Sequence, residues 1–202
     1  MRVLFVVSLI FFSANLAMGT EGDTPCVTVT EGDTPLVSAA QYGQLKALEM
    51  LLQAGANVNQ PETILRKTPL HLAAEFGYRD VVAVLLQNGA HVDCPDENDR
   101  YPLYYAALNG HKEVVQDLID AGAVVDHPDK NKITPLQHAA MCGHKAVVEL
   151  LIKPGANVNH TCNLRLTPFS AAKQNRHQEV MEVLAQSGAD VTVEIVVQIS
   201  RS

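Results

Sequence analysis

Histidine and cysteine are the residues of this 202-residue sequence that are best suited to metal or nucleophilic chemistry, with eight and four copies. Cys94, His127 and His160 recur at one position of a 33-residue period. Zinc prefers imidazole and thiolate ligands, but each ligand atom lies within about 2.3 Å of the ion. Structural units that pack side by side lie about 10 Å apart. These three side chains therefore cannot meet at one ion, and we expect no metal and no cofactor.

The sequence also lacks the common catalytic motifs. It contains no phosphate loop, no GxGxxG, no HExxH and no CxxC. His111, His144 and His177 share a second position of the period. Together with His71, we interpret them as framework residues that bond to nearby backbone. We therefore expect that the protein is not an enzyme.

The four cysteines are an even number, which would suit disulfides in an exported protein. Cys94 and Cys162 lie two periods apart, well beyond the roughly 7 Å between Cα atoms that a disulfide allows. Cys142 occupies a different position of the period. Only Cys26, near the N-terminus, could reach a partner. Free thiols are unusual outside the cell, so these cysteines count against export.

One triplet, Asn159-His160-Thr161, matches the acceptor for N-linked glycosylation. It falls in a loop between two periods, where a glycan would be exposed. We predict Asn159 as a glycosylation site if the chain passes through a eukaryotic secretory pathway.

The elements that position these residues follow from regularly spaced prolines. Five prolines are separated by 34, 33, 33 and 33 residues: Pro35, Pro69, Pro102, Pro135 and Pro168. A glycine stands twenty residues after each of them. Thr precedes each proline except Pro102, which follows Tyr101, and Thr-Pro predicts a helix N-cap and first turn. Such a period is typical of repeat proteins, in which each unit buries its apolar face against its neighbours.

Each unit predicts two helices. The first is short and carries paired alanines, which leave room for close packing, and the second has apolar residues at helical spacing, as in Val81, Val82 and Leu85. The composition agrees with a core of small aliphatic side chains, since 47% of residues are hydrophobic but none is Trp. A glycine three residues before the proline survives only as Gly32, so we expect the corresponding turns of the other units to be less regular.

The units TPLHLAAEFGYRDVVAVLLQNGAHVD (68–93) and TPLQHAAMCGHKAVVELLIKPGANVN (134–159) closely resemble the ankyrin repeat. The resemblance implies an all-α solenoid of stacked helix-turn-helix repeats joined by β-turn or hairpin loops. Five repeats would occupy residues 34–192, starting near 34, 68, 101, 134 and 167. It further implies that a partner protein binds on a concave surface, formed by the turn tips and the ends of the first helices.

Apolar residues that the repeat framework leaves free on that surface are our candidates for partner contacts. Contiguous exposed apolar surface usually marks an interaction site, and aromatic residues and Met are enriched in interface cores. The candidates are Tyr42, Ile64, Leu65, Phe76, Leu108, Ile133, Met141 and Leu166. The alternative is that these side chains only pack against neighbouring helices.

The N-terminus is typical of a secretory signal peptide. Arg2 precedes an apolar run that is too short for a comfortable membrane span, and small residues stand at the positions that a signal peptidase reads. We expect cleavage after Gly19, a secreted protein and no membrane attachment afterwards. The alternative is an intracellular or membrane-anchored scaffold. Residues 20–33 form a leader with a duplicated EGDTP, and residues 193–202 form a C-terminal tail.

Charge limits the kind of partner. The formal net charge of −7 repels a phosphate backbone on average, so we expect no nucleic-acid partner. We expect a monomer, with pairing through the β-branched tail as the alternative. Three classes of protein therefore compete: an exported binding module, an intracellular scaffold, and an enzyme, which the missing motifs disfavour. The first is our prediction, and the identity of its protein partner is not encoded in the pattern.

Overall fold

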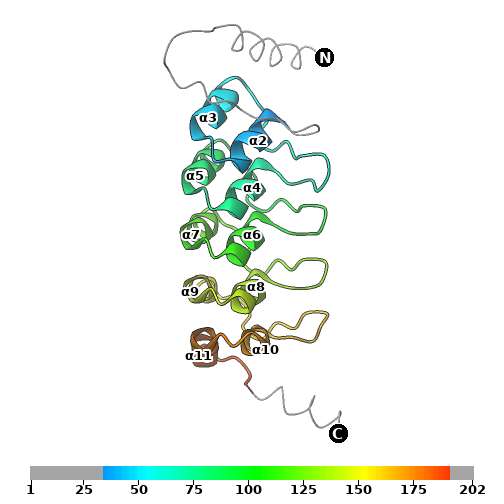
Figure 1. The fold of residues 1–202 in the computed structure, drawn as a ribbon, viewed down its shortest axis with the longest axis vertical. Coiled ribbons are helices and arrows are strands. Elements are labelled where there is room, and N and C mark those ends of the chain that lie inside the picture. Colours follow the sequence, from blue (N-terminus) through cyan, green and yellow to red (C-terminus); the bar gives the residue numbers. More distant parts are fainter. Residues whose placement is uncertain (1–33, 192–202) are drawn as a thin grey trace.

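A computed structural model describes residues 34–191 of the chain. The predicted signal peptide (1–19), the leader (20–33) with Cys26, and the tail (193–202) lie outside the described residues. The described part contains ten α-helices and no strand, arranged as five pairs in one stack (Figure 1).

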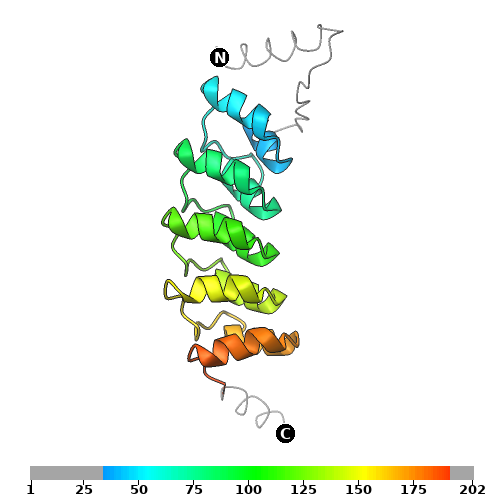
Figure 2. The ribbon, with the colours of Figure 1, turned by 90° about the vertical axis from the view of Figure 1, so that its left-hand side faces the viewer.

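The first helix of every pair begins at a proline of the period. These inner helices are α2 (Pro35–Gln41), α4 (Pro69–Phe76), α6 (Pro102–Asn109), α8 (Pro135–Cys142) and α10 (Pro168–Gln174). The outer helices, seen side by side in Figure 2, are α3 (Leu45–Gln53), α5 (Arg79–Gln87), α7 (Lys112–Asp120), α9 (Lys145–Ile152) and α11 (Gln178–Gln186). Each helix packs mainly against its own partner and the same helix of neighbouring pairs. The predicted all-α solenoid is confirmed.

Small side chains allow this close stacking. The paired alanines of the inner helices are buried throughout the stack: Ala39, Ala40, Ala73, Ala74, Ala106, Ala107, Ala139, Ala140, Ala171 and Ala172. Leu and Val of the outer helices complete one continuous core. Pro154 accounts for the end of α9 at Ile152, because proline has no N–H with which to continue the helix.

Threonine caps fix where the inner helices begin. In α8 the Thr134 hydroxyl accepts from the Gln137 backbone N–H at 3.4 Å, while the Gln137 side-chain oxygen accepts from the Thr134 N–H at 3.1 Å. This reciprocal arrangement is a capping box. Tyr101 makes no side-chain cap at α6, as the missing Thr predicts.

Thr134→Ala should lower the free energy of unfolding by about 1–2 kcal/mol, since the buried N–H of Gln137 loses its acceptor. Urea denaturation followed by circular dichroism measures this loss. Thr134→Ser is the control, because it keeps the hydroxyl and should retain most of the stability. An equal loss in both variants would show that the methyl group, and not the cap, matters.

Four loops, which we call fingers, connect each outer helix to the next inner helix and project from one side of the stack (Figure 1). In chain order the first to fourth fingers are residues 60–67, 94–100, 127–133 and 160–166. A backbone hydrogen bond closes each finger, as from Asp96 N to Arg100 O at 2.9 Å. Further bonds join neighbouring fingers, as from Glu97 N to Leu65 O at 2.9 Å. The fingers therefore form a continuous ladder.

The expectation that these turns are less regular is wrong. One residue at each finger tip has a left-handed φ, between 56° and 59°: Arg66, Asp99, Lys132 and Arg165. Carboxylates support this conformation from inside three of the fingers. Asp129 Oδ1 accepts from the Asn131 and Ile133 N–H groups at 2.8 and 2.9 Å. These bonds compensate for the glycine that the tips lack.

Candidate functional site

An apolar groove opens between the first finger and the inner helices α2 and α4. Its volume is about 310 Å³, and its lining comes from all three elements: Val37, Gln41, Glu62, Ile64, Leu65, Lys67, Leu72, Glu75 and Phe76. Ile64 is 73% exposed, so the groove presents apolar surface that no other part of the described chain covers. Surface of this kind suits a binding site for an apolar side chain.

The structure brings together three of the predicted contact residues and separates the rest. Ile64, Leu65 and Phe76 line the groove. Tyr42 is exposed at the end of α2 but is not part of the lining. The other four are half-buried: Leu108, Ile133, Met141 and Leu166. The exposed members of the predicted set therefore lie in the first two repeats, and the role of all eight residues in partner binding stays a prediction.

The charged groups beside the groove are already engaged. Lys67 Nζ lies 2.7 Å from Glu75 Oε2 and 4.2 Å from the centre of the Tyr105 ring. The Glu62 carboxylate accepts from the N–H groups of Ile64 and Leu65 at 2.8 and 2.6 Å. These contacts hold the finger against the helices. The arrangement is suited to binding.

A buried carboxylate anchors the second finger in the same way. Asp96 accepts from the Asn98 and Arg100 N–H groups at 2.6 and 3.0 Å, and from the Tyr105 hydroxyl at 2.6 Å. Burial, and next the bond to Asp96, raises the pKa of Tyr105, so this phenol remains a donor at neutral pH. The finger is thereby fixed to α6.

Histidines of the following repeat hold the C-terminal ends of three inner helices. The Nε2 atoms of His111, His144 and His177 donate to the carbonyl oxygens of Glu75, Leu108 and Met141, at 2.9, 3.0 and 3.0 Å. These residues are framework residues, as the spacing predicts, but their bonds cross from one repeat to the preceding one instead of staying local. They hold the backbone that carries the predicted contact residues.

The candidate metal ligands lie apart from one another. His160 donates to the Lys132 carbonyl at 2.8 Å, and His127 stacks on Tyr101 with ring centres 4.1 Å apart. Within residues 34–191, no group of three or more His, Cys, Asp or Glu side chains is arranged to hold an ion. The histidine pattern therefore has a structural explanation.

Comparison with known families identifies the repeat. The family model described as ankyrin repeats (3 copies) matches three overlapping stretches, residues 8–96, 61–129 and 103–195, which together cover every described residue. The chain belongs to the ankyrin-repeat family. Members of this family are protein-interaction modules and are generally non-catalytic. No curated protein matches the chain.

In this ankyrin array Cys94, Cys142 and Cys162 are free thiols. Burial raises the pKa of both Cys94 and Cys142, which lowers the thiolate fraction at neutral pH. Cys162 is buried inside the fourth finger. The three thiols therefore lack the features of reactive nucleophiles.

The predicted glycosylation site has a structural role in the ankyrin array. The Asn159 Nδ2 group donates to the Gly188 carbonyl at 3.1 Å, and Asn159 Oδ1 accepts from the Asp190 N–H at 2.7 Å. Asn59 makes the same two contacts near the other end of the array, to the Gly89 carbonyl and the His91 N–H. A glycan would be attached to the same Nδ2 atom that joins the last two repeats. Glycosylation of Asn159 stays a prediction.

Several residues of the site could not be recognised from the sequence. Val37 and Leu72 complete the groove, yet they occupy ordinary core positions of the repeat. The finger carboxylates could have been recognised from the sequence, because Glu62, Asp96 and Asp129 recur at 34- and 33-residue spacing.

No helix within residues 34–191 is long and apolar enough to cross a membrane.

Proposed function

We propose that this chain is an exported, non-catalytic ankyrin module that binds a partner protein through its finger face. We use the term finger face for the four fingers together with the C-terminal ends of the inner helices. The groove at the first finger carries the proposal, because it combines exposed apolar side chains with a rigid frame. An apolar side chain of the partner would fill the groove and release the water that covers Ile64, Leu65 and Phe76.

Rigidity supports this proposal. The groove walls are held by the Lys67–Glu75 ion pair and by the hydrogen bonds that Glu62 accepts. A preorganised surface loses little conformational entropy on binding, which favours affinity. The finger face is made of the turn tips and inner-helix ends on which the family resemblance predicts partner binding.

Replacing Tyr42 and Phe76 by Ala should weaken the binding of a partner recovered with the full chain by about tenfold to a hundredfold, since exposed aromatic anchors dominate many interfaces. Surface plasmon resonance measures the affinity, and thermal unfolding should be nearly unchanged. Met50→Ala is the matched control, because Met50 is 56% exposed on the outer helix α3. Unchanged affinity in the double variant would refute the proposed site.

Export is the second part of the proposal, and it rests on the signal-like N-terminus. Intact mass of the protein from culture medium and from cell lysate tests it directly. A product in the medium that begins at Thr20 is expected. A product confined to the lysate that keeps residues 1–19 would instead favour an intracellular or anchored scaffold, a candidate that the three free thiols support.

A further inference from the structure

Charge is distributed very unevenly along the described chain. Residues 34–129 contain thirteen acidic and six basic side chains, whereas residues 130–178 contain seven basic side chains and a single acid, Glu149. The acidic average of the whole protein therefore hides a basic segment that runs from the third finger to the start of α11. A local field of this kind selects partners independently of the net charge.

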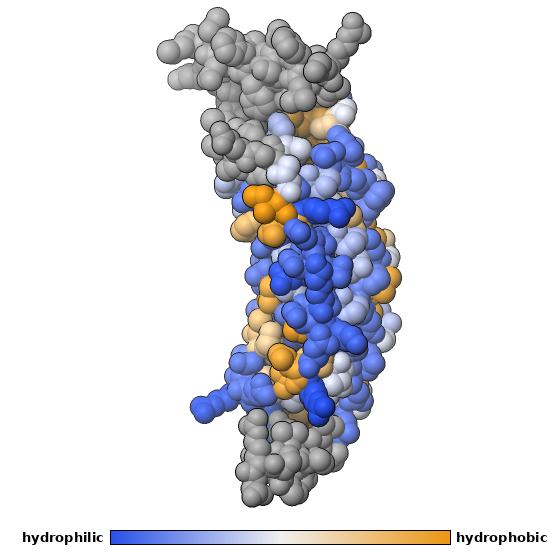
Figure 3. All heavy atoms as spheres, turned by 90° about the vertical axis from the view of Figure 1, so that its right-hand side faces the viewer, coloured by the Kyte–Doolittle hydropathy of each residue, from blue (hydrophilic) through white to orange (hydrophobic). Residues whose placement is uncertain are grey.

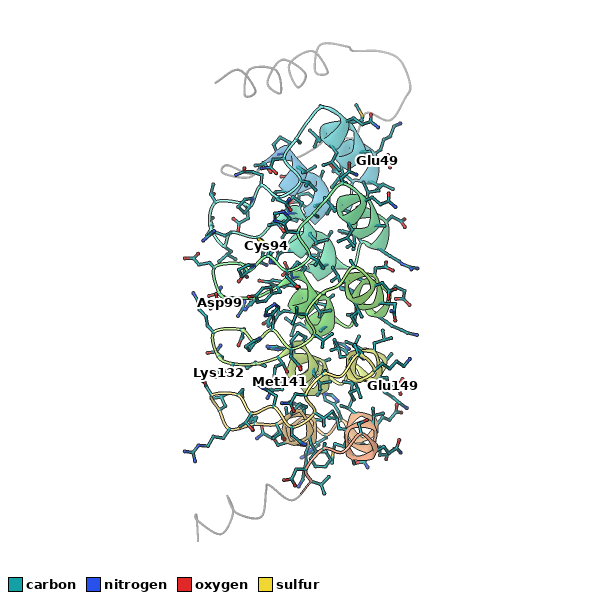
Figure 4. All side chains as sticks on the ribbon, turned by 180° about the vertical axis from the view of Figure 1, so that it is seen from behind. Glu49, Cys94, Asp99, Lys132, Met141 and Glu149 are labelled. Atoms are coloured by element: carbon teal, nitrogen blue, oxygen red, sulfur yellow. The ribbon has the colours of Figure 1, made fainter. Side chains whose placement is uncertain are left out.

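Most of these basic groups lie on the finger face. The third finger carries Lys130 and Lys132, the fourth carries Arg165, and α10 and its C-terminus add Lys173 and Arg176, all of them exposed. Figure 4 shows Lys132 on a finger and Glu149 on the opposite, outer-helix side of the stack. Among residues 34–191, no acidic side chain forms an ion pair with Lys132 or Arg165. These cations are accessible to a ligand.

The backbone presents two of them in a conformation that costs free energy. Lys132 and Arg165 stand at finger tips with a φ of 59°, a region that L-amino acids other than Asn and Asp rarely enter and that Gly enters freely. Arg66 and Asp99 have the same conformation at the other two tips, so the four tips present their side chains from one common backbone geometry.

Apolar surface borders the charge at both ends of the finger face. Figure 3 shows apolar patches near the two ends of this face with hydrophilic surface between them. Ile64 and Leu164 are the most exposed large apolar side chains of the described residues, at 73% and 70%. Between them the second finger carries the exposed acids Glu97 and Asp99. The first finger is apolar with the exposed Arg66 at its tip, the second is acidic, the third is basic, and the fourth is basic with an apolar side chain.

We propose that the finger face binds an extended acidic segment of a partner protein in one defined register. An apolar side chain of the segment occupies the groove at the first finger, uncharged or basic residues cross Glu97 and Asp99, and carboxylates lie over Lys132 and Arg165. Three finger intervals of about 10 Å correspond to about ten residues of extended chain. This inference names the partner class for the proposed function above and rests on it.

Selection of displayed random peptides of about 12 residues on the full chain tests the register. The expected binders carry an apolar residue toward one end and two or more acids toward the other. Their affinity, measured by fluorescence anisotropy, should fall at least about tenfold on Lys132→Glu/Arg165→Glu, and also with rising salt. The control Lys112→Glu/Lys153→Glu makes the same charge change on the outer-helix side and should leave the affinity unchanged.

Other outcomes overturn the inference in distinguishable ways. Binders that depend on Phe76 but show no acidic enrichment would refute the acidic partner and leave the proposed function standing. Binders that neither Phe76→Ala nor the Lys132/Arg165 variant weakens would refute both. Phosphatidylserine vesicles or heparin that bind as tightly as the peptides, without need of Phe76, would show a general anion surface. A tenfold gain in peptide affinity on deletion of residues 20–33 would show that the acidic leader is the occupant.

Discussion

Gly110→Ala is expected to lower the free energy of unfolding by about 3 kcal/mol, a large fraction of the stability of an array of this size. Gly110 ends α6 with a φ of 76°, where a Cβ costs about 1–2 kcal/mol. That Cβ would also lie 2.6 Å from His144 Nδ1. The ring would have to move and release the Leu108 carbonyl, which adds the loss of a hydrogen bond between repeats. Urea denaturation followed by circular dichroism measures the sum.

Gly122→Ala separates the two contributions. Gly122 has a similar φ of 93°, but no heavy atom lies within 4 Å of the added Cβ. This control should lose only the backbone contribution of about 1–2 kcal/mol. Equal losses at Gly110 and Gly122 would show that the histidine contacts add nothing to the stability of the stack.

Acid should destabilise the array through two buried histidines. Burial lowers the pKa of His71 and of His138 from the ordinary 6.5 to about 4. Because the folded-state pKa is lower than the unfolded-state pKa, the unfolded chain binds the proton more readily below pH 6.5. The stabilisation is complete above that pH and is lost as the pH falls through 4. Each histidine should cost about 2 kcal/mol at pH 5, measured by urea midpoints at pH 7.5 and pH 5.

The geometry of His71 supplies a matched variant. Its Nδ1 accepts from the Thr68 N–H at 3.0 Å, so its Nε2 carries the proton and donates to the Arg100 carbonyl at 3.1 Å. Gln137 makes the equivalent two bonds in α8, to Thr134 and Leu166. His71→Gln should therefore keep both bonds and remove about half of the acid sensitivity. If it is as acid-sensitive as the wild type, the protonation of His71 does not limit stability.

The fold could be predicted from the sequence because its rules are local. Each Thr-Pro pair fixes a helix start, and each glycine after an inner or outer helix fixes an end, within a few residues of chain. The histidine bonds could be foreseen only in part, since they join residues 36 positions apart. The finger tips were misjudged, because the carboxylates that support their left-handed residues act from inside the loop.

The candidate site was harder to predict, because the residue type at the exposed helix ends varies from repeat to repeat. Phe76 corresponds to Asn109 and Cys142 and is exposed like them, whereas Leu108 corresponds to Glu75 and Met141 and is half-buried like them. Phe76 stacks on Tyr78, with ring centres 6.1 Å apart. Tyr78 stands where the next three repeats have histidine. The repeat pattern therefore indicates which helix-end positions are exposed, whereas the contact between these two aromatic rings follows only from the structure.

The most direct test of the proposed function is site-specific photo-cross-linking in the protein's own cellular or extracellular environment. A photoreactive phenylalanine would replace Phe76 in the groove or, as the control, Glu149 on the outer-helix side (Figure 4). We expect a discrete covalent adduct with a partner protein from position 76 and none from position 149. Adducts formed equally from both positions, or only from position 149, would contradict binding at the finger face.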